Sequence, residues 1–235
     1  MKLLSFLFVV CTISFASAQN PIIVELFTSQ GCSSCPAADK NLADIIERAE
    51  KNNQEVFGLS FHVDYWNYIG WKDPYSKREF TERQKKYASI LNLEGIYTPQ
   101  MIVNGHVEFV GSDQEKCGDE ISKALKQIPL YQISIADVKK SGQKIFISYS
   151  LDKIPTNSTI NAALVEKDVS NDVTRGENIG RKLAHKNVVR SFTTSIAEKN
   201  GTLELAYPAS NKAVQLIIFL QSSDWRVTGA FRKNL

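Results

Sequence analysis

The chain has 235 residues, of which 28 are basic and 25 are acidic, so its formal net charge at pH 7 is +3. Because the two signs of charge are interspersed, the composition indicates neither a nucleic-acid-binding protein nor a protein of anionic membrane surfaces. Beyond the N-terminus, no segment approaches the about 20 apolar residues of a membrane span, so we expect no membrane-spanning helix.

The N-terminus has the pattern of a signal peptide. Lys2 precedes an apolar run over residues 3–15, and an Ala-Ser-Ala tripeptide ending at Ala18 provides the small residues that signal peptidase requires. The apolar run is too short for a comfortable membrane span. The sequence therefore predicts a signal peptide over residues 1–18, cleaved near Ala18, and a mature protein that is exported to the periplasm or secreted.

Strand and helix patterns alternate along the first half of the mature chain. Capping boxes at 76–79 and 112–115 predict the starts of two helices, and the Asn-Gly pair at 104–105 predicts a two-residue hairpin turn. The β-α-β-α-β-β-α order implies a mixed central sheet flanked by helices. The expected elements are a strand over 22–27, a helix over 36–49, a strand over 56–63, a helix over 76–91, a hairpin over 101–110 and a helix over 112–127.

From residue 130 onward the pattern changes to short strand-like runs separated by Gly, Asn, Ser and Pro. No amphipathic helix is evident there, and the regular spacing predicts an antiparallel β-sandwich. Residues 168–187 lack a regular pattern, which is typical of a functional or mobile loop. We therefore expect an α/β protein with domains over 19–128 and 129–235. The expected strands of the second domain are 133–138, 144–151, 159–165, 188–195, 202–207 and 214–221.

Cys32-Ser33-Ser34-Cys35 lies between the first predicted strand and the first predicted helix. Two thiols at this spacing are close enough to form a disulfide, and the positive end of the helix dipole favours the thiolate form of the first. Cys32 is then the nucleophile and Cys35 the resolving thiol. Without the signal segment, Cys117 is the remaining cysteine, so no even disulfide framework exists, and a close pair in an oxidising compartment indicates redox chemistry.

This arrangement resembles the thioredoxin fold over residues 21–127. In thioredoxin-like proteins a cis-proline precedes the hairpin strand and packs beside the Cys-x-x-Cys, and Pro99 with Thr98 before it matches that position. The resemblance implies that Pro99 is cis and positions the substrate chain, with Thr98 beside it. The alternative is a trans proline that marks the start of a strand.

A closer resemblance is to the secreted family known as "domain of unknown function 1223". The run ELFTSQGCSSCPAAD at 25–39 matches this family, as do residues 60–67, 70–74 and 97–100, and residues 176–190 are similar to its C-terminal pattern. The match spans the mature chain. It implies a fold and a redox centre, and it implies no substrate.

Polar and aromatic residues follow the second predicted strand. His62 and Asp64 leave the end of that strand at which the Cys-x-x-Cys lies. His62 is a candidate proton acceptor for Cys35 or a third metal ligand, and its alternative role is a histidine bonded to the backbone. Tyr65 and Trp66 belong to an aromatic cluster that forms either a substrate groove or the seam against the second domain. The other aromatic residues of that cluster are Tyr68, Trp71 and Tyr75.

A second polar group lies in the C-terminal half. Arg181, His185 and Arg190 either clasp an anionic ligand, close over the redox site, or belong to a solvated loop. Cys117 is most simply a small buried side chain, and a regulatory disulfide is the alternative.

These observations favour an exported thiol–disulfide oxidoreductase that needs no cofactor and acts on thiols or disulfides of proteins or small molecules. One alternative is a copper-binding or other soft-metal module in which Cys32, Cys35 and His62 are the ligands. A second alternative is a secreted, non-enzymatic binding protein whose Cys32–Cys35 bridge is purely structural.

Overall fold

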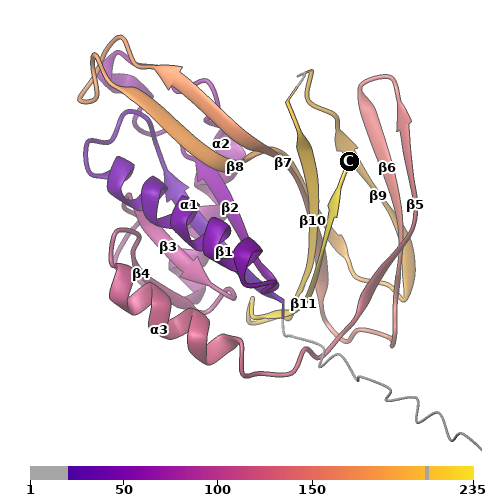
Figure 1. Cartoon of the computed structure of the whole chain (residues 1–235). Coiled ribbons are helices and arrows are strands. Elements are labelled where there is room, and N and C mark those ends of the chain that lie inside the picture. Colours follow the sequence, from indigo (N-terminus) through magenta and orange to yellow (C-terminus); the bar gives the residue numbers. More distant parts are fainter. Residues whose placement is uncertain (1–20, 210–211) are drawn as a thin grey trace, which may run out of the picture.

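The computed structural model describes residues 21–209 and 212–235 (Figure 1). The predicted signal segment, residues 1–18, lies outside the described residues. Across the described ranges, no helix is both long and apolar enough to cross a membrane.

The described chain is mixed α/β, with three α-helices and a larger number of strands. The first half alternates strands and helices, and the second half contains strands alone within the described residues. The elements are β1 (Ile22–Thr28), α1 (Cys35–Lys51), β2 (Val56–His62), the short 3-10 helix η1 (Asn67–Ile69), α2 (Arg78–Ile90), β3 (Gln100–Val103), β4 (Val107–Val110), α3 (Gln114–Ala124), β5 (Ile133–Ser141), β6 (Lys144–Leu151), β7 (Thr159–Asp172), β8 (Lys182–Ile196), β9 (Asn200–Ala206), β10 (Val214–Gln221) and β11 (Val227–Asn234).

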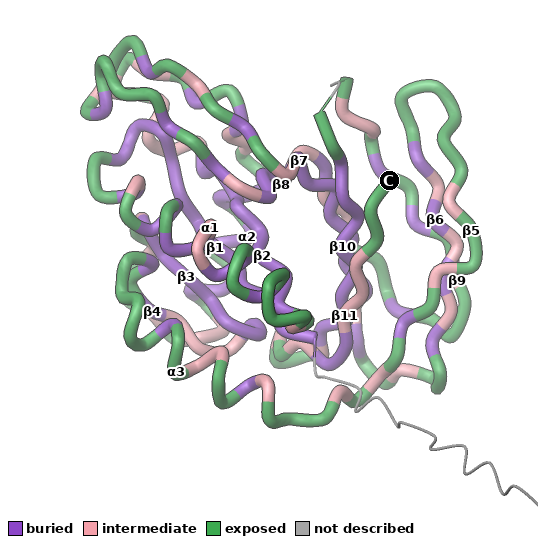
Figure 2. The backbone as a smooth tube through the Cα atoms, viewed as in Figure 1, coloured by how far each residue is buried: buried purple, intermediate pink, exposed green. Residues whose placement is uncertain are grey.

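The first half of the chain forms one end of the large sheet. β1 pairs with β2 in parallel and with β3 antiparallel, and β4 pairs with β3. Successive strand residues point to opposite faces, so Val24 and Leu26 of β1 pack with α1 and α3 while Ile23 and Phe27 pack with α2. The buried strands thus form the centre of three layers (Figure 2).

The same sheet continues into the second half, so its order is β11-β10-β7-β8-β2-β1-β3-β4. The junction is a short parallel pairing in which Ser60 of β2 lies opposite Val188 of β8. Beside it, Nδ2 of Asn187 donates to the carbonyl oxygen of Gly58 at 3.1 Å. The sheet is large and mostly antiparallel, and it spans both sides of the boundary predicted near residue 128.

A second sheet, of order β5-β6-β9, packs on the far half of the large sheet (Figure 1). Its apolar residues form a core with β7 and β10, in which Ile147 of the small sheet and Leu164 and Ile218 of the large sheet are fully buried. The strands expected at 133–221 are therefore present and make two packed layers. The residue pattern does not predict β11, which covers the open edge of β10.

The two predicted capping boxes are not formed. Helix α2 begins at Arg78, and the Ser76 hydroxyl bonds to the Asp73 carbonyl at 2.8 Å instead of capping the helix. Helix α3 begins at Gln114, and its cap is Asp113, whose carboxylate accepts from the Lys116 N–H at 3.0 Å. At α3 the Asp113 carboxylate takes the capping position that the pattern assigned to serine, and at α2 the N-cap residue is Lys77, which makes no side-chain capping bond.

Two loops also differ from the prediction. The β3–β4 turn has three residues, 104–106, because Val103 pairs with Val107. The stretch over 168–187 is largely a regular β-hairpin, since β7 extends to Asp172 and β8 starts at Lys182. The loop at its tip, residues 173–181, is called the strap below. It reaches over the first half of the chain (Figure 1).

Candidate functional site

Cys32 and Cys35 form a disulfide, with their Cα atoms 5.4 Å apart. The turn after β1 carries Cys32, and α1 begins at Cys35 with a proline in its first turn. The two cysteines are buried, with exposed fractions of 1% and 0%, although Ser33 and Ser34 between them are exposed. The disulfide therefore lies just below the surface, under a covering of other residues.

The Thr98–Pro99 peptide bond lies beside the disulfide and is cis, as the family resemblance implies. The carbonyl oxygen of Thr98 is 3.8 Å from Sγ of Cys32. Trp66 Nε1 donates to the Thr98 hydroxyl at 2.7 Å. The structure thus brings together four residues that the sequence places at the site, namely both cysteines, Thr98 and Pro99, and it connects Trp66 to them.

The strap covers this site. Nδ2 of Asn178 donates to the carbonyl oxygens of Gln30 and Cys32, each at 2.9 Å, and Asn178 is fully buried. Arg181 holds the other side of this amide, because its Nη1 donates to Asn178 Oδ1 at 2.9 Å. The Glu177 carboxylate accepts from the Ser33 N–H at 2.9 Å, and hydrogen bonding from the Ser33 side chain and from this N–H lowers the pKa of Glu177.

A buried polar network lies under the turn that carries Cys32. The backbone N–H of Gln30 donates to Asp73 Oδ2 at 2.8 Å, and the same oxygen contacts His62 Nδ1 at 2.7 Å. The Gln30 side chain reaches His185 Nε2 at 3.1 Å. Burial raises the pKa of Asp73, but the charge and hydrogen bond of His62 outweigh it, so the net pKa is lowered.

His185 connects this network to helix α1. Its Nδ1 lies 3.4 Å from a carboxylate oxygen of Asp39. Its ring packs against the ring of His62 in a T-shaped arrangement, with 4.7 Å between the ring centres. Burial lowers the pKa of His185, but the charges of Asp39 and Asp73 outweigh burial, so its pKa is raised. Asp39 follows Cys35 by four positions on α1, which places the two side chains on one face of the helix.

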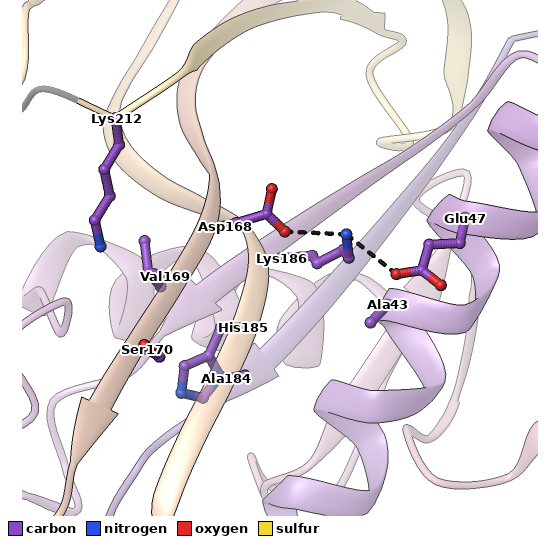
Figure 3. Close-up of a pocket in the computed structure, with 9 residues that line it drawn as sticks. All are labelled: Ala43, Glu47, Asp168, Val169, Ser170, Ala184, His185, Lys186 and Lys212. Atoms are coloured by element: carbon purple, nitrogen blue, oxygen red, sulfur yellow. Dashed lines mark ion pairs between the residues drawn. The ribbon is translucent and has the colours of Figure 1, made fainter.

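A pocket of about 480 Å³ opens beside His185, between α1 and the β7–β8 ribbon (Figure 3). At its rim, Lys186 Nζ bridges Glu47 at 3.1 Å and Asp168 at 3.0 Å. The imidazole of His185 is the one titratable ring among the residues that line this pocket. The pocket gives solvent a route toward the buried histidine and, behind it, Asp39.

The aromatic cluster is divided between burial and exposure. Tyr75 is buried and its hydroxyl donates to Asn171 Oδ1 at 2.6 Å. Trp71 Nε1 donates to Gln30 Oε1 at 3.2 Å, which ties the cluster to the polar network. Tyr68 is 82% exposed. Most of the cluster therefore packs around the site, and Tyr68 alone of these residues projects far into solvent.

Three further predicted residues have partners of their own. The Asp64 carboxylate accepts from the Thr81 hydroxyl at 2.6 Å. Arg190 forms an ion pair with Glu166 at 2.8 Å. Tyr65 packs against the apolar core under α2, where burial raises the pKa of its hydroxyl. These contacts are sufficient to explain Asp64 and Arg190 without any contact to the disulfide.

Within the described ranges, no group of three His, Cys, Asp or Glu residues is arranged to hold a metal ion. Nδ1 of His62 is hydrogen-bonded to Asp73. Nε2 of His62 is buried and has no hydrogen-bond partner among the described residues. Cys117 is buried against Met101, with 3.3 Å between the two sulfur atoms, and burial raises the pKa of its thiol to about 12.

Sequence reasoning missed the roles of Gln30, Asp39, Asp73 and Asn178. Asp73 and Asn178 lie in segments that resemble the family, at 70–74 and 176–190, so that resemblance was the available signal. Gln30 and Asp39 likewise lie in the matching run at 25–39, but neither lies in a local pattern that distinguishes it from a residue of a solvated turn or a helix surface.

The family model described as "Protein of unknown function (DUF1223)" matches residues 23–221, which is most of the chain. The chain belongs to this family. No curated protein matches it significantly.

Among solved structures, this DUF1223 protein is similar to a crystal structure of a protein from Agrobacterium tumefaciens. The two are 29% identical, with a TM-score of 0.68, and the match covers 92% of this chain and 95% of the other. A β-glucuronidase from Ruminococcus gnavus matches 46% of this chain and 16% of its own length at 15% identity. Its TM-score of 0.27 is too low to support any conclusion about fold or function.

Proposed function

We propose that this protein is an exported thiol–disulfide oxidoreductase of thioredoxin-like fold, with Cys32 as nucleophile and Cys35 as resolving thiol. The observation that supports this proposal is the position of the Cys32–Cys35 disulfide, between the start of α1 and the cis Thr98–Pro99 bond. A helix start favours a thiolate, and thiolate character controls the rate of exchange. The carbonyl of Thr98 borders the sulfur that a substrate must reach.

The chemistry in the reducing direction balances as follows. The Cys32 thiolate attacks one sulfur of a substrate disulfide, so that a mixed disulfide forms and the first substrate thiolate leaves and takes a proton from solvent. Cys35 loses its proton to a base and attacks Sγ of Cys32, which releases the second substrate thiolate, and this thiolate also takes up a proton. The substrate gains two electrons and two protons, and the cysteine pair becomes a disulfide. The reverse sequence oxidises a dithiol.

The buried polar network supports the step in which Cys35 changes protonation. Asp39 faces Cys35 along α1, and His185 lies 3.4 Å from Asp39 at the inner end of the solvent pocket. This pair is placed to take the proton of Cys35 and pass it toward solvent. His62, held by Asp73, supports the ring of His185 from the other side.

A Cys35→Ser variant of the mature protein tests the proposal. It should accumulate mixed disulfides through Cys32, visible as dithiothreitol-sensitive bands on non-reducing gels and identified by mass spectrometry. The Cys32→Ser variant is the matched control and should trap nothing. A Cys35→Ser protein that forms no mixed disulfide with protein or small-molecule disulfides would exclude the mechanism.

Two measurements separate the alternatives. The reduction potential of Cys32–Cys35 should lie above the range of structural disulfides, which is below about −300 mV, and a value within that range would favour a structural bridge. Copper bound stoichiometrically to reduced protein, and lost in His62→Ala, would favour a soft-metal module instead. N-terminal sequencing of the mature protein tests cleavage near Ala18 and with it export.

A further inference from the structure

A second pocket lies between α2 and the ends of β7, β8 and β10. Its volume is about 540 Å³, within the range of small-molecule sites. It shares no lining residue with the disulfide, the strap or the pocket beside His185. The side chains that matter below are Arg83 and Lys86 of α2, Phe192 and Thr194 of β8, and Trp225 of the β10–β11 turn.

Arg83 is the inner wall of this pocket, and its guanidinium is only partly used. Nε and Nη2 donate to the two carboxylate oxygens of Glu25 at 2.6 and 2.8 Å, and Nη2 also contacts Tyr87 and Gln221. In the described part of the chain, Nη1 donates no hydrogen bond. A guanidinium has five N–H donors, so two remain for an oxygen atom of a ligand.

Five aromatic rings surround this guanidinium, and two of them, Phe192 and Trp225, line the pocket. Its central carbon lies 4.8 Å from the ring centre of Phe192 and 5.1 Å from that of Trp225. Trp225 has a φ of 65°, a left-handed conformation that is strained for a bulky residue. Tyr87 packs edge-on against the indole, at 4.7 Å between ring centres, and so fixes its orientation. The fold therefore holds a flat apolar surface beside unused donors.

The charges at the rim favour an anionic ligand. Glu25 already balances the charge of Arg83, and the two acidic residues of the rim, Glu79 and Glu82, contact Lys77 and Lys85 respectively. Lys86 lies one turn after Arg83 on the same side of α2, and it forms no ion pair within the described residues. One positive charge is therefore left over at the mouth of the pocket.

We propose that this pocket binds a small organic carboxylate with a flat apolar ring. The ring lies against Trp225 and Phe192, and the carboxylate accepts from Nη1 of Arg83 and from Lys86. Thr194, whose hydroxyl already donates to Asn161 at 2.7 Å, offers its remaining lone pair to a donor on the ligand. This site is independent of the redox chemistry.

The test uses 1-naphthylacetate as the probe and 1-naphthylacetamide as its uncharged analogue. Both are titrated into the disulfide-bonded mature protein, and the indole N–H signals of the three tryptophans are followed by NMR. The signal of Trp225 is identified from Trp225→Phe. We expect the acid to shift this signal and to bind about tenfold more tightly than the amide, because charge-assisted bonds are the stronger ones.

Two variants make the assignment specific. Lys86→Gln should weaken binding of the acid roughly three- to fivefold and leave binding of the amide unchanged. Lys51→Gln, at the exposed end of α1 on the other face of the sheet, should change neither. Trp225→Gly suits the left-handed backbone, so it should keep the fold and abolish binding of both probes, which calorimetry measures because the reporting indole is absent from this variant. The proposal is overturned if the Trp225 signal does not move, if acid and amide bind equally, or if Trp225→Gly binds as wild type does.

Discussion

The strap makes the most direct prediction, through Asn178→Ala. The substitution removes two buried hydrogen bonds to the carbonyls of Gln30 and Cys32, and the acceptor for Arg181. Each buried bond contributes about 1 kcal/mol net, and the two orphaned carbonyls add to the cost, so we expect a loss of about 2–3 kcal/mol in the free energy of unfolding. Urea denaturation monitored by circular dichroism measures this loss.

The same substitution should also expose the disulfide. If the bonds of Asn178 hold the strap closed, losing about 2–3 kcal/mol raises the open population roughly 30- to 150-fold. The rate at which dithiothreitol reduces Cys32–Cys35 should therefore rise at least about tenfold, while Ile179→Ala, in the exposed neighbour, should leave it unchanged. Asn178→Asp keeps the size of the side chain but places a carboxylate against both carbonyls. It should therefore raise the reduction rate more than Asn178→Ala does. Equal reduction rates in wild type and Asn178→Ala would refute the covering role.

Three further predictions concern buried groups. Arg83→Met should lower the free energy of unfolding by about 3–5 kcal/mol because it leaves Glu25 as an uncompensated buried charge, and adding Glu25→Gln should recover part of the loss in a double-mutant cycle. The pKa of His185 is raised in the folded protein, so its contribution to stability is complete below about pH 6.5 and is lost as the pH rises through the pKa of the folded state. The free energy of unfolding should therefore fall over that pH range. His185→Gln should reduce this dependence of the free energy of unfolding on pH. Cys117, with a thiol pKa of about 12, should react with iodoacetamide only on unfolding, and modification in reduced, native protein at pH 8 would contradict its burial.

Local patterns were enough to predict the strand–helix unit that carries the cysteines. The β-branched run before Cys32 and the apolar spacing after Cys35 place the disulfide correctly, because both depend on neighbours in sequence. The position of Pro99 came from resemblance to a family and not from any pattern of its own. The strands of the second half were likewise predictable, because each is a short strand-like run between turn residues, and β6 and β9 also alternate between buried and more exposed positions.

The covering of the site could not be predicted in the same way. The bond from Asn178 to the carbonyl of Cys32 spans 146 positions, and the contact of His185 with Gln30 spans 155. These contacts depend on how β8 is placed next to β2. The one residue pair that joins these strands leaves no pattern in the sequence around either residue. Residues 168–187 are polar and aperiodic, a pattern that indicates a loop. In the structure, β7 and β8 continue into this stretch because their backbones remain paired up to Asp172 and Lys182.

The pairing of Ser60 with Val188 joins the two halves of the chain, so it determines which fragments of the protein can fold alone. A fragment that ends near residue 128 would encode both cysteines and Pro99, yet β2 would present an unpaired edge of apolar residues, which promotes aggregation. It would also lack the asparagine that closes the turn and the histidine beside α1. We therefore expect the two halves to fold only when they are expressed together, although the residue pattern of each half resembles that of an independent domain.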